Sequence, residues 1–259
     1  MNETFNFTRF LNLFKKHTAE QYKTYLMSTG VLIGVLILVL GFISYSTKGH
    51  MGPVIQAAMF VNFLFFSGTI FTSLIFTDLG DRKKSIPALS LPASHFEKYL
   101  VAWLYSFVIF QLVFLGCFYA IDYLVITIGN ANSPDKIEVV NVFSTDRKVW
   151  VSFLVFAILH SICFFGAVFF EKLHFIKTVF SFFIFIAMLC LLNPVLLHTI
   201  FQEEIDNGIP FNMVGLIINK EYIYIEPTKT SFIIAATVAI LISVILWIST
   251  YFRLKEKQV

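Results

Sequence analysis

Six stretches of the chain are almost continuously apolar and contain no Asp, Glu, Lys or Arg. Each is close to the roughly 20 residues that a helix needs to cross the hydrocarbon layer of a membrane. They are residues 25–45, 54–77, 99–121, 150–170, 178–201 and 231–252. The segments between them are too short for a second domain. The pattern therefore predicts an all-α integral membrane protein in which residues 1–259 form one membrane domain with six transmembrane helices.

The composition agrees with this prediction. Hydrophobic residues make up 58% of the chain, charged residues make up only 14%, and the mean hydropathy is +0.80. A soluble domain carries about 25% charged residues. An ordinary soluble enzyme is therefore excluded.

The few charged residues are divided unevenly between the two sides of the predicted membrane domain. With six spans both termini lie on one side, and that side carries 13 of the 19 Lys and Arg residues. Its formal charge is +6, and that of the opposite side is −3. The positive-inside rule then predicts a protein of the cell (inner) membrane with both termini in the cytoplasm. Membrane insertion alone requires this distribution, so it predicts no nucleic-acid site.

The segment before the first span, residues 4–23, has a helical pattern of its own. Phe7, Phe10, Leu11 and Phe14 follow the i, i+3, i+4, i+7 spacing of one helix face, and basic residues lie on the other faces. Such a helix would lie in the membrane interface and contact membrane lipids. The alternative is a simple positive flank that orients the first span.

The loop between the second and third spans, residues 78–98, combines charged and apolar residues. It holds a basic cluster and spaced apolar residues, namely Arg82, Lys83, Lys84, Ile86, Leu89, Leu91 and Pro92. Ser94 and Glu97 have the spacing of a capping box, which predicts that the third helix begins near Ser94. A plain connecting loop that obeys the positive-inside rule is the alternative.

The chain resembles the permease subunits of the type-2 family of ABC transporters, which are mainly exporters. The resemblance rests on the basic cluster, the Leu-Pro-Ala-Ser element at 91–94, the Glu-Lys-Tyr at 97–99, the preceding amphipathic helix and the six-span layout. It implies a membrane-spanning permease subunit that forms the translocation path of an ATP-driven exporter. Its partners would be an ABC ATPase subunit and a second permease copy or paralogue, which together make a dimer of permeases.

The same resemblance assigns a role to the loop at 78–98. In this family the loop is a cytoplasmic coupling element that docks on the ATPase subunit. That role would fall on Arg82, Lys83, Lys84, Ile86, Leu89, Leu91 and Pro92, with Ser94 and Glu97 holding the geometry.

The sequence predicts no catalytic residue, metal site or cofactor in the chain itself. None of its glycines lies in a G-x-x-x-x-G-K-[ST] loop, so any ATP would be bound by the partner subunit. Cys117, Cys163 and Cys190 all fall within predicted spans and lack the spacing of metal ligands.

Four polar residues, Asn62, Gln111, His160 and Asn193, fall at membrane depth within the predicted spans. Such groups either form hydrogen bonds between helices or line a substrate path, and the sequence leaves both readings open. No span has a charged residue near its centre. A carrier driven by protons or ions normally has ionisable groups there, which favours an external source of energy.

The outer segment at 202–230 contains an apolar run at 209–218 that is too short to cross a membrane. A re-entrant or interfacial element is one interpretation, to which type-2 permeases offer a parallel between their last two spans. A small cap packed on the ends of the spans is the other.

Two other functions compete with a transporter subunit. Glu203 and Glu204 resemble the paired glutamates of membrane-embedded prenyl-protein proteases. In that family an Arg follows four residues after the first Glu, whereas this chain has Asn207 there and no His beyond it. The chain could instead be a non-transporting membrane anchor within a larger complex.

Overall fold

The computed structural model describes residues 5–76, 93–131, 136–144, 149–170, 173–207, 213–218, 221–226 and 228–256. Within these ranges, six helices are long and apolar enough to cross a membrane. Each contains most or all of one predicted span. The prediction of a mostly helical chain with six helices able to span a membrane is therefore confirmed.

The six helices are α1 (Phe7–Ser46), α2 (Pro53–Leu74), the continuous run of α4 (His95–Trp103), η2 (Leu104–Ile109) and α5 (Phe110–Asn130), then α6 (Val151–Phe169), α7 (His174–Phe201) and α8 (Lys229–Glu256). α1, the α4–α5 run and α8 extend beyond the predicted spans at both ends, and α7 begins before its predicted span. The segment η2 is a single stretch of π-helix inside the third span. The 40 residues of α1 correspond to about 60 Å of helix, twice the thickness of the hydrocarbon layer.

The amphipathic N-terminal segment and the first span form one helix. Asn6 caps α1, because its side-chain oxygen accepts hydrogen bonds from the backbone N–H groups of Thr8 and Arg9. The helix then continues without interruption to Ser46. The apolar stripe of this segment is partly covered by the rest of the protein. Phe10 is buried against α4, whereas Phe7 is 63% exposed.

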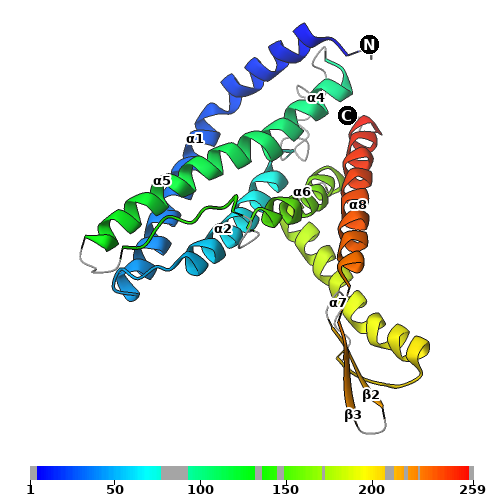
Figure 1. The fold of residues 1–259 in the computed structure, drawn as a ribbon. Coiled ribbons are helices and arrows are strands. Elements are labelled where there is room, and N and C mark those ends of the chain that lie inside the picture. The colour runs from blue at the N-terminus through cyan, green and yellow to red at the C-terminus, as the bar shows by residue number, and fades with distance from the viewer. Residues whose placement is uncertain are drawn as a thin grey trace.

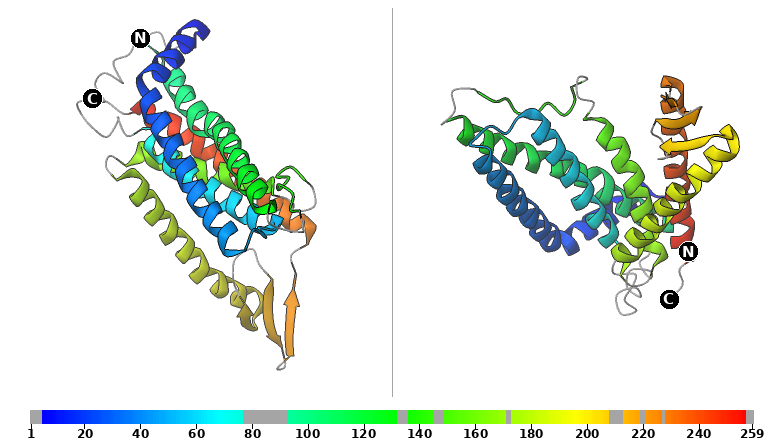
Figure 2. Two further views of the ribbon diagram at one scale, coloured as in Figure 1. Left: turned by 90° about the vertical axis from the view of Figure 1, so that its left-hand side faces the viewer. Right: turned by 90° about the horizontal axis from the view of Figure 1, so that it is seen from below.

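The helices form two groups that meet at α6. α1 packs beside the α4–α5 helix, α2 packs against α5 and α6, and α6 also contacts α7 and α8. The first turn of α1 and the last turn of α8 lie at the same end of the molecule, which we call the terminal end (Figures 1 and 2). The opposite end, where α1 and α5 finish, is called the distal end.

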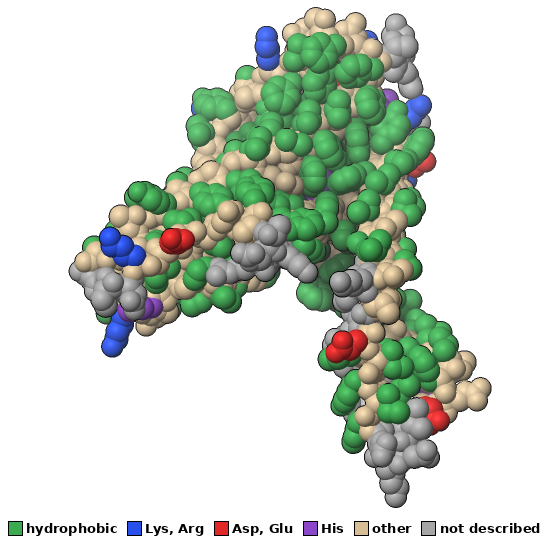
Figure 3. Space-filling model, in the orientation of Figure 1, with side chains coloured by type: hydrophobic (Ala, Val, Ile, Leu, Met, Phe, Trp, Pro, Cys, Tyr) green, Lys and Arg blue, Asp and Glu red, His purple; other side chains and the backbone are tan. Residues whose placement is uncertain are grey.

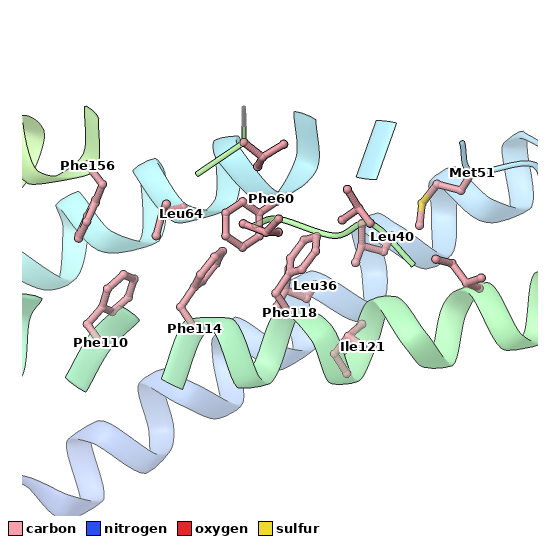
Figure 4. Close-up of a cluster of buried hydrophobic side chains, with 14 residues drawn as sticks. Leu36, Leu40, Met51, Phe60, Leu64, Phe110, Phe114, Phe118, Ile121 and Phe156 are labelled. Atoms are coloured by element: carbon pink, nitrogen blue, oxygen red, sulfur yellow. The ribbon is translucent and has the colours of Figure 1, made fainter. Parts of the chain in front are cut away.

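Aromatic side chains fill the core between α1, α2 and α5. Phe60 of α2 lies against Phe114 and Phe118 of α5, with ring centroids 5.4 and 5.1 Å apart. Figure 4 shows these rings between Leu36 of α1 and Phe156 of α6. Offset and edge-on pairs of this kind contribute about 0.5–1.5 kcal/mol each beyond the area they bury.

The outside of the molecule is also apolar. Green hydrophobic side chains cover most of the face in Figure 3, and charged side chains appear mainly toward the extremities. In α7 no residue of the most apolar stretch is buried, and Phe180, Leu191 and Ile200 are each at least 66% exposed. A helix that is apolar on all sides requires a lipid environment or another protein.

The expected all-α fold requires one correction. After α7 the chain forms a three-stranded antiparallel sheet in the order β1 (Glu204–Asn207), β2 (Val214–Ile218) and β3 (Glu221–Ile225). Val214 pairs with Ile225 at one end of the β2–β3 ladder. Figure 1 shows this sheet at the tip of α7, beyond the ends of the other helices at that side.

A polar side chain ties an extended strap, residues 136–144, across the distal end. The amide of Gln56, which is fully buried in α2, donates to the carbonyl of Glu138 and accepts from the N–H of Val140 at 2.6 Å. Val140 and Val142 of the strap are buried. Asn130 pairs with the N–H and carbonyl of Ile137, and the Tyr119 hydroxyl accepts from the N–H of Val142. Side chains of α2 and α5 therefore supply the partners that the strap backbone lacks.

Candidate functional site

Most of the predicted coupling loop lies outside the described residues. This applies to Arg82, Lys83, Lys84, Ile86, Leu89, Leu91 and Pro92. The structure does describe the exit of the loop, where Ser94 and Glu97 begin α4.

The predicted capping box at this exit is present. The backbone N–H of Glu97 donates to Ser94 Oγ at 3.2 Å, and the backbone N–H of Ser94 donates to Glu97 Oε2 at 3.0 Å. Two N–H groups that the first turn of the helix cannot pair are thereby satisfied. α4 accordingly begins at His95, as the sequence indicates.

Glu97 also joins the start of α4 to the start of α1. Its Oε1 accepts from the backbone N–H of Asn6 at 2.8 Å and from Arg9 Nη2 at 3.1 Å. The Glu97 side chain is fully buried, whereas that of Arg9 is 32% exposed. A buried carboxylate needs such partners, and removing one leaves charge without compensation. Glu97 thus fixes the position of α1 relative to the exit of the loop.

Aromatic contacts extend this junction along α1. Tyr105 of η2 is 5% exposed and lies between three side chains of α1. Its ring centroid is 4.9 Å from that of Phe14, 4.7 Å from that of His17 and 5.2 Å from that of Tyr25. Its hydroxyl also forms a hydrogen bond with Thr18. We call this set of contacts, together with Asn6, Arg9, Ser94 and Glu97, the α1–α4 junction.

A second polar cluster lies deep within the spans around His160, which is fully buried in α6. Trp247 Nε1–H of α8 donates to His160 Nδ1 at 3.1 Å, and His160 Nε2 lies 2.9 Å from Ser106 Oγ. Because indole N–H can only donate, Nδ1 carries no proton, and the imidazole is neutral with its proton on Nε2. His160 therefore donates to Ser106, whose own hydroxyl donates to the carbonyl of Ala102.

This proton arrangement determines what the Ser106–His160 pair can do chemically. To act as a base toward Ser106, His160 would have to accept the hydroxyl proton at Nε2, but that nitrogen carries the proton while Nδ1 accepts from Trp247. The pair is therefore arranged as a link between η2, α6 and α8 and not as an activated nucleophile. Sequence reasoning selected His160 but missed Ser106 and Trp247 as its partners, because they lie 54 and 87 residues away.

The other three polar residues at membrane depth lie on different helices. Asn62 of α2 donates to the carbonyl of Ala58 and is exposed to a groove beside α6. Gln111 is near the start of α5, and its buried Nε2 has no hydrogen-bond partner. Asn193 precedes Pro194 within α7. Gln111, His160 and Asn193 are not among the residues that line this groove.

An unpaired buried carboxyl lies near the distal end of α5. Asp122 is fully buried, and neither of its carboxylate oxygens has a hydrogen-bond partner. It belongs to the inward-facing stripe of α5 that also includes Phe114, Phe118 and Ile126. Within the described ranges, no three His, Cys, Asp or Glu side chains come together as metal ligands.

The comparisons with known proteins identify no relative of this chain. No family model, no curated protein and no solved structure matches it. The chain is therefore identified here only as a mostly helical integral membrane protein with six helices able to span a membrane.

Proposed function

We propose that the chain is the membrane-spanning permease subunit of an ATP-driven exporter of the type-2 ABC kind. Two copies, or one copy and a paralogue, would form the translocation path. ATP would be bound by a separate ATPase subunit, since this chain has no phosphate-binding loop of its own. The terminal end would face the cytoplasm.

The observation that carries this proposal is the α1–α4 junction. A coupling loop must end on a rigid element if a displacement by the ATPase is to reach the spans. The loop exit has that property, because Ser94 and Glu97 close a capping box and Glu97 binds Asn6 and Arg9 as well. A push on residues 78–92 would then move the third span and α1 together.

The decisive experiment is purification of the tagged full-length chain from its own membranes in mild detergent. We expect an ATPase subunit with a phosphate-binding loop to co-purify, and the eluate to hydrolyse ATP. The double variant Leu89→Asp, Leu91→Asp should lose this subunit. The double variant Ile223→Asp, Ile225→Asp places the same two charges on exposed residues of β3 at the distal end, and it should retain the ATPase subunit.

Three results would count against the proposal. Absence of any ATPase from the wild-type eluate would remove the permease assignment. An ATPase that remains bound to the Leu89→Asp, Leu91→Asp variant would remove the docking role of the loop. An ATPase that hydrolyses ATP in reconstituted vesicles without moving lipid, peptide or drug would instead identify a non-transporting anchor.

A further inference from the structure

The sheet that follows α7 has two edges of different character. Its order is β1-β2-β3, so β1 and β3 are its outer strands in the described part of the chain (Figure 1). β1 contacts α7 and contains a bulge, because Ile205 pairs with Leu216 and Asn207 with Gly215, which leaves Asp206 as an extra residue. A bulge bends a strand and interrupts further pairing. The β1 edge is therefore poorly suited to accept another strand.

The β3 edge is regular and exposed. Its residues 221–225 pair with β2 one by one and without a bulge. Tyr222 and Tyr224 on one face are 63% and 55% exposed, and Ile223 and Ile225 on the other face are both 43% exposed. None of these four positions holds a Lys or Pro, the residues that often protect edge strands. Such an edge presents a row of backbone N–H and C=O groups, which recognises an extended strand.

The difference between the two edges restricts which strand would bind. If β3 of one copy paired with β1 of another, every copy would keep a free edge, and the contact would repeat into a filament. The bulge in β1 opposes that arrangement. Antiparallel pairing of β3 with β3 of a second copy closes on a two-fold axis and leaves no regular edge exposed.

The sequence of this segment complements itself in one register. From 220 to 226 it reads Lys-Glu-Tyr-Ile-Tyr-Ile-Glu. A two-fold axis at Ile223 would set Ile223 against its counterpart and Glu226 opposite the basic position 220 of the second copy. Opposite charges across a strand pair are favourable. A shift by one residue would instead set Glu221 opposite Glu226, and like charges there are unfavourable.

We propose that β3 is a homodimerisation edge, at which the β3 strands of two copies pair antiparallel about Ile223 and join their sheets into one of six strands. The partner is a second copy of this chain. The pairing goes beyond the proposed function, which leaves open whether the second permease is identical. It requires no ATPase subunit, so its failure would leave the co-purification test of that function unaffected.

Disulfide cross-linking of the full-length chain in its own membranes tests the pairing. With the three native cysteines replaced by Ala, Ile223→Cys should give a product of twice the chain's mass on mild oxidation, because directly opposite residues lie within reach of a disulfide. Ile225→Cys is the matched control, since Ile225 has the same exposure and lies on the same face. The two Ile225 positions would be about 13 Å apart along the strands, so this variant should cross-link at least about tenfold less.

Charge reversal checks the register. In the Ile223→Cys background, Glu226→Lys would set Lys opposite Lys and should reduce the cross-linked fraction at least about twofold. Adding Lys220→Glu restores opposite charges and should restore the fraction, which separates a lost contact from misfolding. The proposal would be overturned by equal cross-linking of Ile223→Cys and Ile225→Cys, by no dimer or a product that contains another protein, or by no rescue in the double reversal.

Discussion

A carboxylate shielded from solvent must be supplied with hydrogen-bond donors, and Glu97 receives three. They come from Asn6, Arg9 and Ser94, and therefore from two segments about 90 residues apart. Both carboxylate oxygens of Glu97 are used, and an ionised carboxylate can only accept hydrogen bonds. The requirement for a charged acceptor is what makes this position sensitive to small chemical changes.

Glu97→Gln keeps the size of the side chain but places an NH₂ group against one of these donors. Hydrogen bonds to charged groups contribute about 1.5–3 kcal/mol, so we expect the melting temperature to fall by roughly 4–8 °C. The melting temperature is measured by following thermal aggregation of the tagged chain in detergent. Glu20→Gln is the control, because the Glu20 side chain is 60% exposed and pairs with Lys16 of the same helix. Equal melting of the two variants would show that the junction does not hold α1.

The capping box at Ser94 was predictable because it depends on residues three positions apart and on a rule of helix ends. The contacts of Glu97 with Asn6 and Arg9 were not, because they join distant segments that only the packing of α1 on α4 brings together. His160 shows the same limit. Its polarity at membrane depth was visible, but the identity of its two partners required the fold.

At the scale of elements, glycine sets how closely α6 and α7 approach. A Cβ atom at Gly166 would lie 1.9 Å from Thr178 Oγ1, so no larger residue fits without moving α7. Gly166→Ala should therefore destabilise the chain by about 1–3 kcal/mol through overpacking. Gly116→Ala, where the added atom meets nothing within 4 Å, should be neutral or stabilising.

The double variant Gly166→Ala, Thr178→Ala checks the cause of that effect. Thr178→Ala removes the two nearest atoms and should restore part of the lost stability. Thermal unfolding of the four proteins in the same detergent gives the coupling between the two sites. Strictly additive effects would mean that the contact between α6 and α7 is not the source of the loss.

The strap at the distal end, residues 136–144, forms hydrogen bonds with the Gln56 side chain. Gln56→Leu conserves volume but leaves the backbone groups of Glu138 and Val140 unpaired. We expect amide exchange at Val140 to accelerate at least about tenfold, measured by hydrogen–deuterium exchange. Gln111→Leu removes a buried Nε2 that has no partner, and exchange in the strap should then remain unchanged. Unaltered exchange in Gln56→Leu would show that the other contacts of the strap, including those of Asn130 and Tyr119, hold it without Gln56.

The sheet that follows α7 marks where pattern reading failed at this scale. The apolar run at 209–218 was judged by its length against a membrane crossing, which is a test for helices. Strands need partners, and β2 acquires them from β1 and β3 on both sides. The apolar and polar residues of this segment alternate too weakly to predict strands, so the sequence did not indicate the pairing.

At the scale of the whole molecule, the six spans were predictable because length and apolar composition alone determine them. Their packing was not, since almost every face is apolar and any pair of helices could meet. The common position of the α1 start and the α8 end is the global feature that the structure adds (Figure 2). It agrees with an even number of spans but leaves the side of the membrane to experiment.

Cysteine labelling in intact cells determines that side. With the three native cysteines replaced by Ala, we expect Lys48→Cys at the distal end to react with a membrane-impermeant maleimide added outside. Lys15→Cys, on the exposed part of α1, should react only after the membrane is permeabilised. This follows from the excess of Lys and Arg at the terminal end. The reverse pattern would place both termini outside and exclude a cytoplasmic coupling loop.

The π-helical segment η2 has a consequence for how this chain can be compared with others. A π turn accommodates about one residue more than the α-helix around it, so the third span reads as an ordinary helix into which a residue has been inserted between Leu104 and Ile109. Every inward position beyond that point, from Phe110 to Ile126, is shifted by one relative to the helical repeat before it. A relative without the insertion would align correctly over only one half of this helix.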